Sequence, residues 1–331
     1  MLAALASAGL NSASLWANEV NIYSARQEEL IKPLLDKFSA DTGIKVNLIT
    51  GNADELITRI SSEGRNSPAD LLLSTDVGRL ARAKEQGILQ QVSSNILDSQ
   101  IPAALRDPAG LWFGLTVRAR PILYVPTKVD PSELSTLADL TSAKWRGRIC
   151  VRSSNNIYNQ SMVAALIAHD GVAVSEQWVE GLVRNLARPP RGGDRDQIKA
   201  AAAGVCDIAL ANTYYLAGML ADARDKADAE KVAVFWPDQA GRGTHINISG
   251  AGVAAHAPNQ ANAIRLLEYM VQPAAQQWYA EANHEYPVLA DVAISELLKS
   301  FGDFKADSLE LSKVAELNAE AIRIMDRARW R

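Results

Sequence analysis

CDIALANTYYLAG, residues 206–218, holds two adjacent tyrosines between a predicted strand and a predicted helix. Residues 207–211 are small and aliphatic, and because this run is too short for a helix it predicts a buried strand. An Asn-Thr pair follows, and both residue types are common at helix N-caps. Tyr214 and Tyr215 therefore stand at the carboxyl edge of a predicted sheet, where α/β folds bind ligands. On this stretch alone, two tyrosines that close a hydrophobic core are the simpler interpretation.

Outward from this stretch, short apolar runs alternate with helical periodicity along most of the chain. Before residue 90 the order is strand, helix, strand, helix, strand, helix, which predicts a mostly parallel sheet with right-handed crossovers. A second set of this kind begins after Pro131. Between the sets, residues 112–126 are extended and too long for one ordinary strand, and residues 241–255 form a strand that crosses back. The fold class is therefore predicted as α/β with two lobes, joined by these two extended hinge crossings.

The length of 331 residues leaves room for two such lobes, each a mostly parallel sheet flanked by helices. A clamshell of this kind closes on a ligand that is held in the cleft between the lobes. Each lobe is expected to be discontinuous in sequence. The N-terminal lobe is expected to comprise residues 18–117 and 241–290, and the C-terminal lobe residues 118–240 and 291–331.

Composition narrows the function classes. Hydrophobic residues make up 48% and charged residues 22%, as in ordinary soluble globular proteins. A net charge of −4 gives no electrostatic footprint for nucleic acid, and no run reaches transmembrane length.

Residues 1–17, MLAALASAGLNSASLWA, resemble the remnant of an export signal peptide without its basic region, with cleavage after Ala17. A short tail is the alternative interpretation of this segment.

The chain has two cysteines, Cys150 and Cys206, each in or beside a predicted buried strand. An even pair in an exported protein suggests a disulfide bond. Two free buried thiols that behave as small hydrophobic residues are the alternative.

Motifs of the common enzyme classes are missing from the sequence. We find no GxSxG elbow, no Walker A glycine loop and no GxGxxG after a predicted strand. The four histidines show neither HExxH nor His-x-His spacing, so a zinc site is not predicted. These observations favour a binding protein over an enzyme.

Four tyrosines stand at predicted strand ends that face the cleft: Tyr23 ends the first strand, Tyr158 follows the strand RICV, and Tyr214 and Tyr215 follow DIALA. Several phenols that converge on one point suggest a hard, highly charged cation. A phenol normally titrates near about 10, but coordinated ferric iron would deprotonate it, and phenolate is a known ligand of ferric haem iron. Four phenolates on Fe3+ leave a net charge of −1. Arg118, on the crossing strand, is placed to balance this charge, with an ion pair between the lobes as the alternative role.

With these features the chain resembles the periplasmic ferric-iron-binding proteins of ABC transporters, the FbpA/FutA-like group of the bacterial transferrin-like family. The paired tyrosines and the SSNxYNQS pattern are the most specific features. The resemblance spans nearly the whole chain after residue 17 and is carried, in order, by NIYSARQ (21–27), GRNSPADLLLSTDVGRL (64–80), WFGLTVRAR (112–120), LTSAKWRGRICVRSSNNIYNQS (140–161), ANTYYLAG (211–218) and EYPV (285–288).

The resemblance implies a type II periplasmic-binding-protein clamshell with a ferric site in its cleft. It implies that Tyr158, Tyr214 and Tyr215 are ligands from the second lobe, Tyr23 is the ligand from the first, and Arg118 lies beside the metal or a bound anion. The chain departs from the pattern at residue 27, where many relatives carry a ligand histidine and this chain has glutamine. Gln27 is therefore not counted as a ligand, and carbonate or water is expected to complete the coordination.

The expected function is that of the solute-binding component of an iron(III) ABC importer. It would be a periplasmic monomer of a Gram-negative-type bacterium or a cyanobacterium, and it would deliver Fe3+ to an inner-membrane permease. It would neither bind nucleic acid nor span a membrane. Three alternatives stay open. One is a clamshell that binds an oxyanion or a small organic cation through neutral phenols, another is an iron-sequestering protein not coupled to transport, and the third is an enzyme on the same fold.

Overall fold

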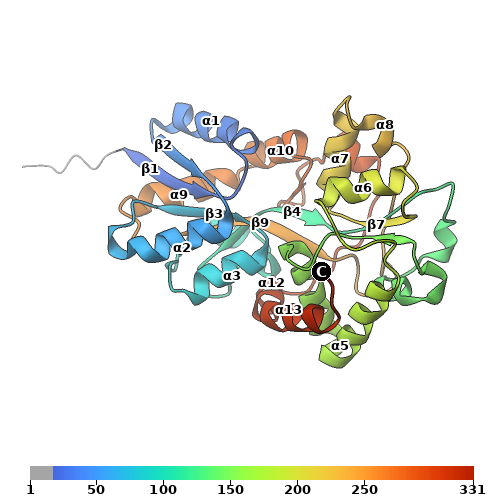
Figure 1. The fold of residues 1–331 in the computed structure, drawn as a ribbon. Coiled ribbons are helices and arrows are strands. Elements are labelled where there is room, and N and C mark those ends of the chain that lie inside the picture. Colours follow the sequence, from blue (N-terminus) through green and yellow to red (C-terminus); the bar gives the residue numbers. More distant parts are fainter. Residues whose placement is uncertain (1–17) are drawn as a thin grey trace, which may run out of the picture.

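Two β-sheets organise residues 18–331, the part of the chain that the computed structural model describes (Figure 1). One sheet has the strand order β10-β4-β9-β3-β1-β2, and the other has the order β6-β7-β5-β8. The strands of the larger sheet are β1 Glu19–Ser24, β2 Lys45–Thr50, β3 Leu71–Thr75, β4 Phe113–Ala119, β9 Ile246–Val253 and β10 Tyr286–Pro287. Those of the smaller sheet are β5 Ile122–Tyr124, β6 Ile149–Cys150, β7 Ile208–Leu210 and β8 Ala233–Phe235. The predicted export-signal remnant, residues 1–17, lies outside the described residues.

Helices flank both sheets, so the predicted two-lobe α/β architecture is confirmed (Figure 1). The first lobe carries α1 Lys32–Thr42, α2 Ala53–Glu63, α3 Val77–Glu85, α4 Asn95–Gln100, α9 Gln260–Met270 and α10 Pro273–Ala282. The second carries α5 Ile157–Arg184, α6 Asp194–Ala202, α7 Thr213–Ala221, α8 Lys226–Ala229 and α11 Glu296–Lys299. The C-terminal helices are α12 Leu311–Glu316, which contacts both α3 and α5, and α13 Asn318–Arg327, which contacts α5. Short 3-10 helices occupy Glu28–Leu30, Gly64–Asn66, Ala103–Leu105, Pro131–Glu133, Leu137–Thr141 and Ala143–Trp145.

Several helix boundaries follow directly from the sequence. The side chain of Asn52 caps α2 by accepting a hydrogen bond from the amide of Asp54, and Asn156 caps α5 in the same way. Helix α1 ends at Thr42 and is followed by Gly43, whose φ of 71° is left-handed and suits glycine. Within α5 the backbone leaves the helical conformation at Gly171, so this element consists of two helical segments.

The sheets are mixed, which corrects the expectation that each is mostly parallel. Strand β1 runs parallel to β2 and β3, and β6 runs parallel to β7, but the remaining pairs are antiparallel. The reason lies in the connections between the lobes. Strand β4 leads the chain out of the first lobe and β9 leads it back, so the two lie side by side in opposite directions.

The crossings between the lobes are shorter than the extended stretches expected from the sequence. Arg120 and Pro121 divide the first stretch into β4 and β5, and β4 stays in the larger sheet to Ala119, two residues past the expected lobe boundary at 117. The second crossing runs from β8 to β9. The two crossings meet where the amide of Arg120 donates to the carbonyl oxygen of His245 at 3.0 Å. Away from these crossings, the expected division of the chain into lobes stays a prediction.

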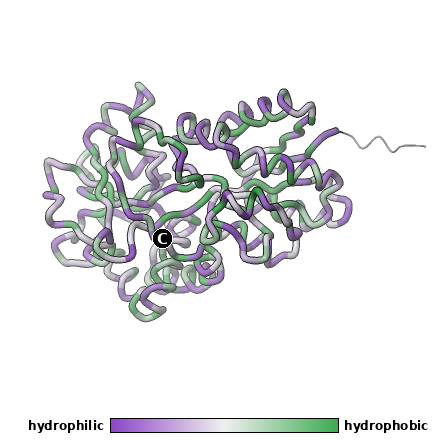
Figure 2. Tube along the Cα trace, turned by 180° about the vertical axis from the view of Figure 1, so that it is seen from behind, coloured by the Kyte–Doolittle hydropathy of each residue, from purple (hydrophilic) through white to green (hydrophobic). Residues whose placement is uncertain are grey.

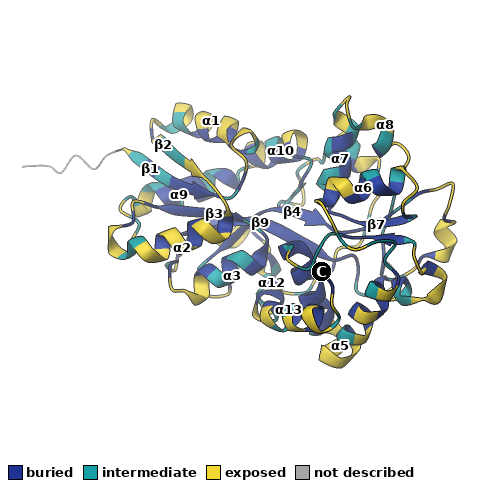
Figure 3. Ribbon diagram, in the orientation of Figure 1, coloured by how far each residue is buried: buried dark blue, intermediate teal, exposed yellow. Residues whose placement is uncertain are grey.

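Strands β4 and β9 form a buried axis through the molecule. Every residue of both strands is buried, and Figure 3 shows them in dark blue between the lobes. Figure 2 shows hydrophobic stretches along the interior strands and hydrophilic ones over much of the periphery. The backbones of β4 and β9 approach closely at Gly250, where an added Cβ would lie 2.6 Å from the carbonyl oxygen of Phe113. Only glycine fits this position without displacing β4.

The substitution Gly250→Ala is therefore expected to destabilise the protein by about 1–3 kcal/mol, as overpacking of a buried site does. The free energy of unfolding, measured by urea denaturation, tests this expectation. Gly241→Ala is the matched control, because an added Cβ there meets only the Asp238 carbonyl oxygen at 3.8 Å. Equal stability of the Gly250→Ala variant and the wild type would contradict the packing argument.

Candidate metal centre

A cavity of about 690 Å³ lies in the cleft between the lobes and takes its lining from both. The walls contain three tyrosines, several basic residues and a few polar groups. The polar lining residues are Arg26, Gln27, Thr75, Arg118, Tyr158, Arg195, Tyr214, Tyr215, Asp222, Asn283, His284 and Glu285. The composition of the walls indicates a site for a small polar or charged ligand.

The structure brings together three of the four predicted tyrosines. Tyr158 lies in the first turn of α5, where its amide donates to the Asn156 side chain at 3.2 Å. Tyr214 and Tyr215 lie in the first turn of α7, directly after β7, and their ring centroids are 4.2 Å apart. The guanidinium carbon of Arg118 is 5.0 Å from the Tyr214 ring centroid and 6.0 Å from that of Tyr158. Two strand-to-helix junctions thus direct Tyr158 and Tyr214 toward Arg118, while the guanidinium carbon of a second arginine, Arg195, lies 5.4 Å from the ring centroid of Tyr215.

Tyr23 does not join them, which corrects the expectation that it faces the cleft. Its hydroxyl lies 3.1 Å from both carboxylate oxygens of Glu63, and the Arg59 guanidinium carbon is 4.8 Å from its ring centroid. Both partners belong to α2, which is not part of the cavity wall. Successive side chains of a strand point to opposite faces, and Tyr23 is on the face of β1 that α2 covers. The chain enters the cleft two residues later, at Ala25.

The first lobe instead contributes residues that no motif or periodicity singles out. Gln27, which is not expected to be a ligand, lines the cavity. His284 also lines it and has a left-handed backbone conformation with a φ of 52°. Its buried Nδ1 atom has no hydrogen-bond partner among the described residues, and burial lowers the pKa of the ring. The sequence signal for His284 was only its position directly before the EYPV segment.

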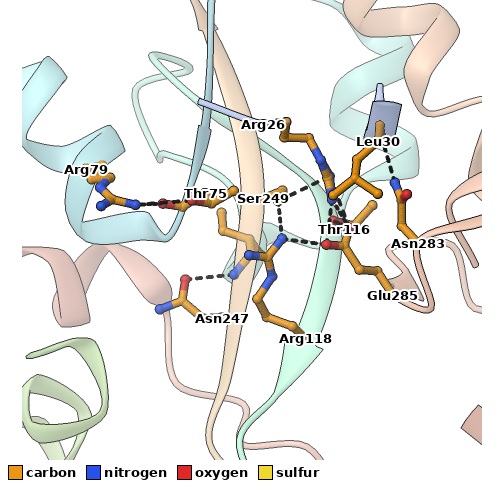
Figure 4. A network of polar contacts seen from close by, with 11 residues as sticks. Arg26, Leu30, Thr75, Arg79, Thr116, Arg118, Asn247, Ser249, Asn283 and Glu285 are labelled. Atoms are coloured by element: carbon orange, nitrogen blue, oxygen red, sulfur yellow. Dashed lines mark hydrogen bonds and ion pairs between the residues drawn. The ribbon is translucent and has the colours of Figure 1, made fainter. Parts of the chain in front are cut away.

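A buried cluster of charges forms the floor of the cleft (Figure 4). Glu285 accepts hydrogen bonds from Arg26 at 2.5 Å, from Arg118 at 2.8 Å and from the Thr116 hydroxyl at 2.6 Å. Arg118 also donates to the hydroxyl of Ser249. Burial favours a protonated Glu285, but Arg26 and Arg118 outweigh this effect and hold its pKa below the usual range. The ionised cluster of two arginines and one glutamate therefore carries a net charge of about +1.

This cluster bears on one of the two roles considered for Arg118, an ion pair between the lobes. The arginine does form an ion pair, but with Glu285 beside β10, in the same sheet as Arg118 itself. At the same time its guanidinium lies against the rings of Tyr214 and Tyr158. Arg118 is therefore fixed by the first lobe and presented to the phenols of the second.

Burial holds two of the phenols, Tyr214 and Tyr215, in their neutral form when no cation is bound. Burial raises the pKa of Tyr214 well above its ordinary value, and the neighbouring Tyr158 and Tyr215 add to this, against an opposite effect of Arg118. Burial also raises the pKa of Tyr215, followed by the effects of Tyr158 and Asp194. A phenolate forms here only if a cation replaces the proton. Among residues 18–331, no three histidine, cysteine, aspartate or glutamate side chains cluster to hold a metal ion. The tyrosines are thus the best candidate donors.

The two predicted cysteines are joined in a disulfide bond, with Cα atoms 5.8 Å apart. Cys150 ends β6 and Cys206 shortly precedes β7, the two strands whose ends carry the phenols. These strands pair over only two residues each, Ile149 with Ile208 and Cys150 with Ala209. By the chain-entropy model, a loop of this length adds about 4 kcal/mol of stability. The bond therefore braces the junctions that carry the phenols.

A hinged two-lobe α/β fold with converging polar groups in the cleft between its lobes defines a solute-binding protein. The chain belongs to the family described as bacterial extracellular solute-binding protein, whose sequence model matches residues 33–306. The predicted family resemblance and type II periplasmic-binding-protein fold are confirmed. No helix within residues 18–331 combines the length and apolarity needed to cross a membrane.

Particular relatives narrow the comparison. Iron uptake protein A1 of Synechocystis sp. is 50% identical over 315 residues, which cover 95% of this chain and 88% of that protein. The structure of Trichodesmium IdiA (FutA) in complex with iron and citrate ligands matches with a TM-score of 0.92 and 54% sequence identity. The match covers 95% of this chain and 100% of the Trichodesmium chain. The Fe(3+)-binding periplasmic protein of Serratia marcescens is 28% identical over 91% of this chain and 89% of that protein.

Because the raised pKa values of Tyr214 and Tyr215 keep these phenols protonated in the free protein, binding of ferric iron is expected to weaken as the pH falls. Each phenol that becomes a ligand must release its proton, so three ligands release about three protons per ion. The apparent affinity, measured by competition with a chelator between pH 5 and 8 and corrected for the protonation of that chelator, checks this. An affinity that is unchanged or higher in acid would contradict phenolate ligation.

Proposed function

We propose that this protein is the solute-binding component of an iron(III) ABC importer. It captures Fe3+ in the cleft through Tyr158, Tyr214 and Tyr215 and delivers it to an inner-membrane permease. The observation that carries the proposal is that three phenols line one cleft between the two lobes, two of them beside the buried Arg118. The names of its relatives, which refer to iron uptake, ferric binding and bound iron, support the same cargo.

The charges of the site fit a trivalent cation. Three phenolates neutralise Fe3+, so the ion and its protein ligands form a neutral unit, in contrast to the charge of −1 expected from four tyrosines. Phenolate is also a hard oxygen donor, which a hard ion such as ferric iron prefers. The positive cluster of Arg26, Arg118 and Glu285 is then left to attract a further anion. Carbonate in the remaining coordination positions would balance this positive charge, whereas water would leave it unbalanced.

The proposed location is the periplasm, with the protein working as a monomer. The Serratia marcescens relative is named as a periplasmic protein, and the disulfide between Cys150 and Cys206 suits an oxidising compartment. The proposed partner is a membrane permease, because extracellular solute-binding proteins of ABC importers hand their cargo to one. We propose the role of a carrier without catalytic activity.

One observation favours a second candidate, a clamshell that binds an oxyanion. The raised pKa values of Tyr214 and Tyr215 keep the free phenols neutral, so that they can donate hydrogen bonds. Arg118 and Arg195 in the same cavity could then balance an anionic ligand. The two candidates differ in colour, because a ferric phenolate complex absorbs visible light and an oxyanion complex does not.

A visible absorption titration with ferric citrate therefore tests the proposed function. The wild type is expected to give a broad visible band that saturates at about one equivalent of iron, as a single site requires. Tyr214→Phe removes a donor and is expected to weaken binding by more than about a hundredfold, the upper end of what loss of an outer-shell partner costs. Because Tyr214 is partly exposed to the cavity, the thermal unfolding of the Tyr214→Phe variant is expected to differ little from that of the wild type.

Tyr23→Phe is the matched control, since it removes a buried tyrosine hydroxyl that is bonded to Glu63 outside the cavity. This variant is expected to bind iron as the wild type does. A colourless titration of the wild type would overturn the iron proposal in favour of the oxyanion. Full iron binding by Tyr214→Phe would remove that residue from the site, and loss of binding in Tyr23→Phe would restore the first-lobe tyrosine to it.

A further inference from the structure

Arg120 is a buried arginine that stands where the two crossings between the lobes meet. It follows β4 directly, its side chain is 1% exposed, and its amide donates to the carbonyl oxygen of His245 on the returning crossing at 3.0 Å. It does not line the cavity, in contrast to Arg118 two positions earlier. Its side chain extends into the second lobe, where all its hydrogen-bond partners lie.

The guanidinium of Arg120 bonds to a neighbour of each phenol-bearing junction. One terminal nitrogen donates to the Oδ1 atom of Asn212 at 2.9 Å, and the other donates to the Oδ1 atom of Asn159. Asn159 directly follows Tyr158 in the first turn of α5. Asn212 is the N-cap residue of α7 and precedes Tyr214 by two positions. A single planar group thus connects the starts of the two helices that carry the three phenols.

The partners of Arg120 are otherwise arranged to support this connection. The side-chain Nδ2 atom of Asn159 donates to the carbonyl oxygens of Arg152 at 2.9 Å and Ser153 at 3.1 Å, and these two bonds fix the orientation of the Asn159 Oδ1 atom. The side chain of Asn212 has no other hydrogen-bond partner among residues 18–331. Asp194, which lies 3.3 Å from Arg120, balances its buried charge. Arg120 is therefore the residue that links the Asn212 side chain, at the start of α7, to the start of α5.

We propose that Arg120 is the positioning residue of the metal centre. It sets the first turns of α5 and α7 relative to each other, so that Tyr158 and the Tyr214–Tyr215 pair converge before any cargo arrives. Within residues 18–331, Arg120 donates no hydrogen bond to a phenol and does not line the cavity, so it acts through Asn159 and Asn212. Its effect on iron rests on the proposed function, but its effect on the arrangement of the phenols does not.

Lysine is unsuited to replace Arg120, because an ammonium group is a point charge and does not reproduce the planar fork that reaches both amides. Arg120→Lys in the full chain keeps the positive charge beside Asp194 and is therefore the first variant to test. Arg148→Lys is the matched control. Arg148 is an arginine of the same lobe that is bonded to Asp207 at 2.6 Å, and none of its partners adjoins a phenol.

The first measurement uses the protein without iron, labelled with ¹³C in its tyrosine rings. Arg120→Lys is expected to shift the ring resonances of Tyr158, Tyr214 and Tyr215 while leaving those of Tyr23 and Tyr269 unchanged. The second is the ferric citrate titration, in which Arg120→Lys is expected to lose about 10–100-fold in affinity and to shift the visible band, as loss of an outer-shell partner does. Arg148→Lys is expected to match the wild type in both.

Unchanged ring resonances in Arg120→Lys, or an iron affinity within about twofold of Arg148→Lys, would overturn the proposal. A wild type without a visible band would remove the proposed function, and the ring resonances of the iron-free protein would still decide the role of Arg120.

If Arg120→Lys does not fold, substitutions of its partner take its place. Asn212→Asp keeps the acceptor for Arg120 and is expected to preserve the phenol resonances. Asn212→Leu has a similar volume but removes the acceptor, and it is expected to reproduce the shift of Tyr214 and Tyr215. Equal resonances in these two variants would overturn the proposal, because they would show that the bond to Arg120 does not position α7.

Discussion

The cleft depends on one physical constraint, the burial of two arginines against a single glutamate. Glu285 is 3% exposed at its side chain and bonds to both Arg26 and Arg118, so each guanidinium can stay charged away from bulk water. Because one carboxylate cannot neutralise two guanidinium groups, the floor of the cleft keeps a positive charge. That charge favours a ligand set that becomes anionic when the cargo binds, and in the proposed function the three phenols provide it.

This constraint also links the parts of the chain that build the site. Arg26 follows β1, Arg118 lies on the outgoing strand β4, and Glu285 directly precedes β10, so the ion pairs tie three distant segments of one lobe together. Arg120, at the crossing that follows β4, extends its side chain into the second lobe and bonds there to Asn212 and Asn159, which adjoin the phenols. Two arginines separated by one residue thus serve opposite sides of the same site.

Local sequence signals predicted the second lobe well and the first lobe poorly. The strand-to-helix junctions of Tyr158 and of Tyr214 and Tyr215 are encoded within a few neighbouring residues, because a short apolar run and a capping asparagine suffice to form them. The prediction that Tyr23 faces the cleft was wrong because successive residues of a strand point to opposite faces. Only the packing of α2 decides which of these faces is covered. Glu285 could not be found, since its partner Arg118 lies 167 residues away in the sequence. The directions of the strands depend in the same way on tertiary connections, and so the mixed sheets were not predicted.

All three phenols belong to one lobe, and this separates capture from enclosure. In the proposed function, the second lobe alone supplies the charged donors, and the first lobe supplies Gln27, His284 and the positive floor. The open protein would then already hold its cargo, and the swing of the first lobe would set how long the cargo stays rather than whether it is caught. A membrane partner that pries the lobes apart would shorten the residence time of the ion without having to break the phenolate bonds first.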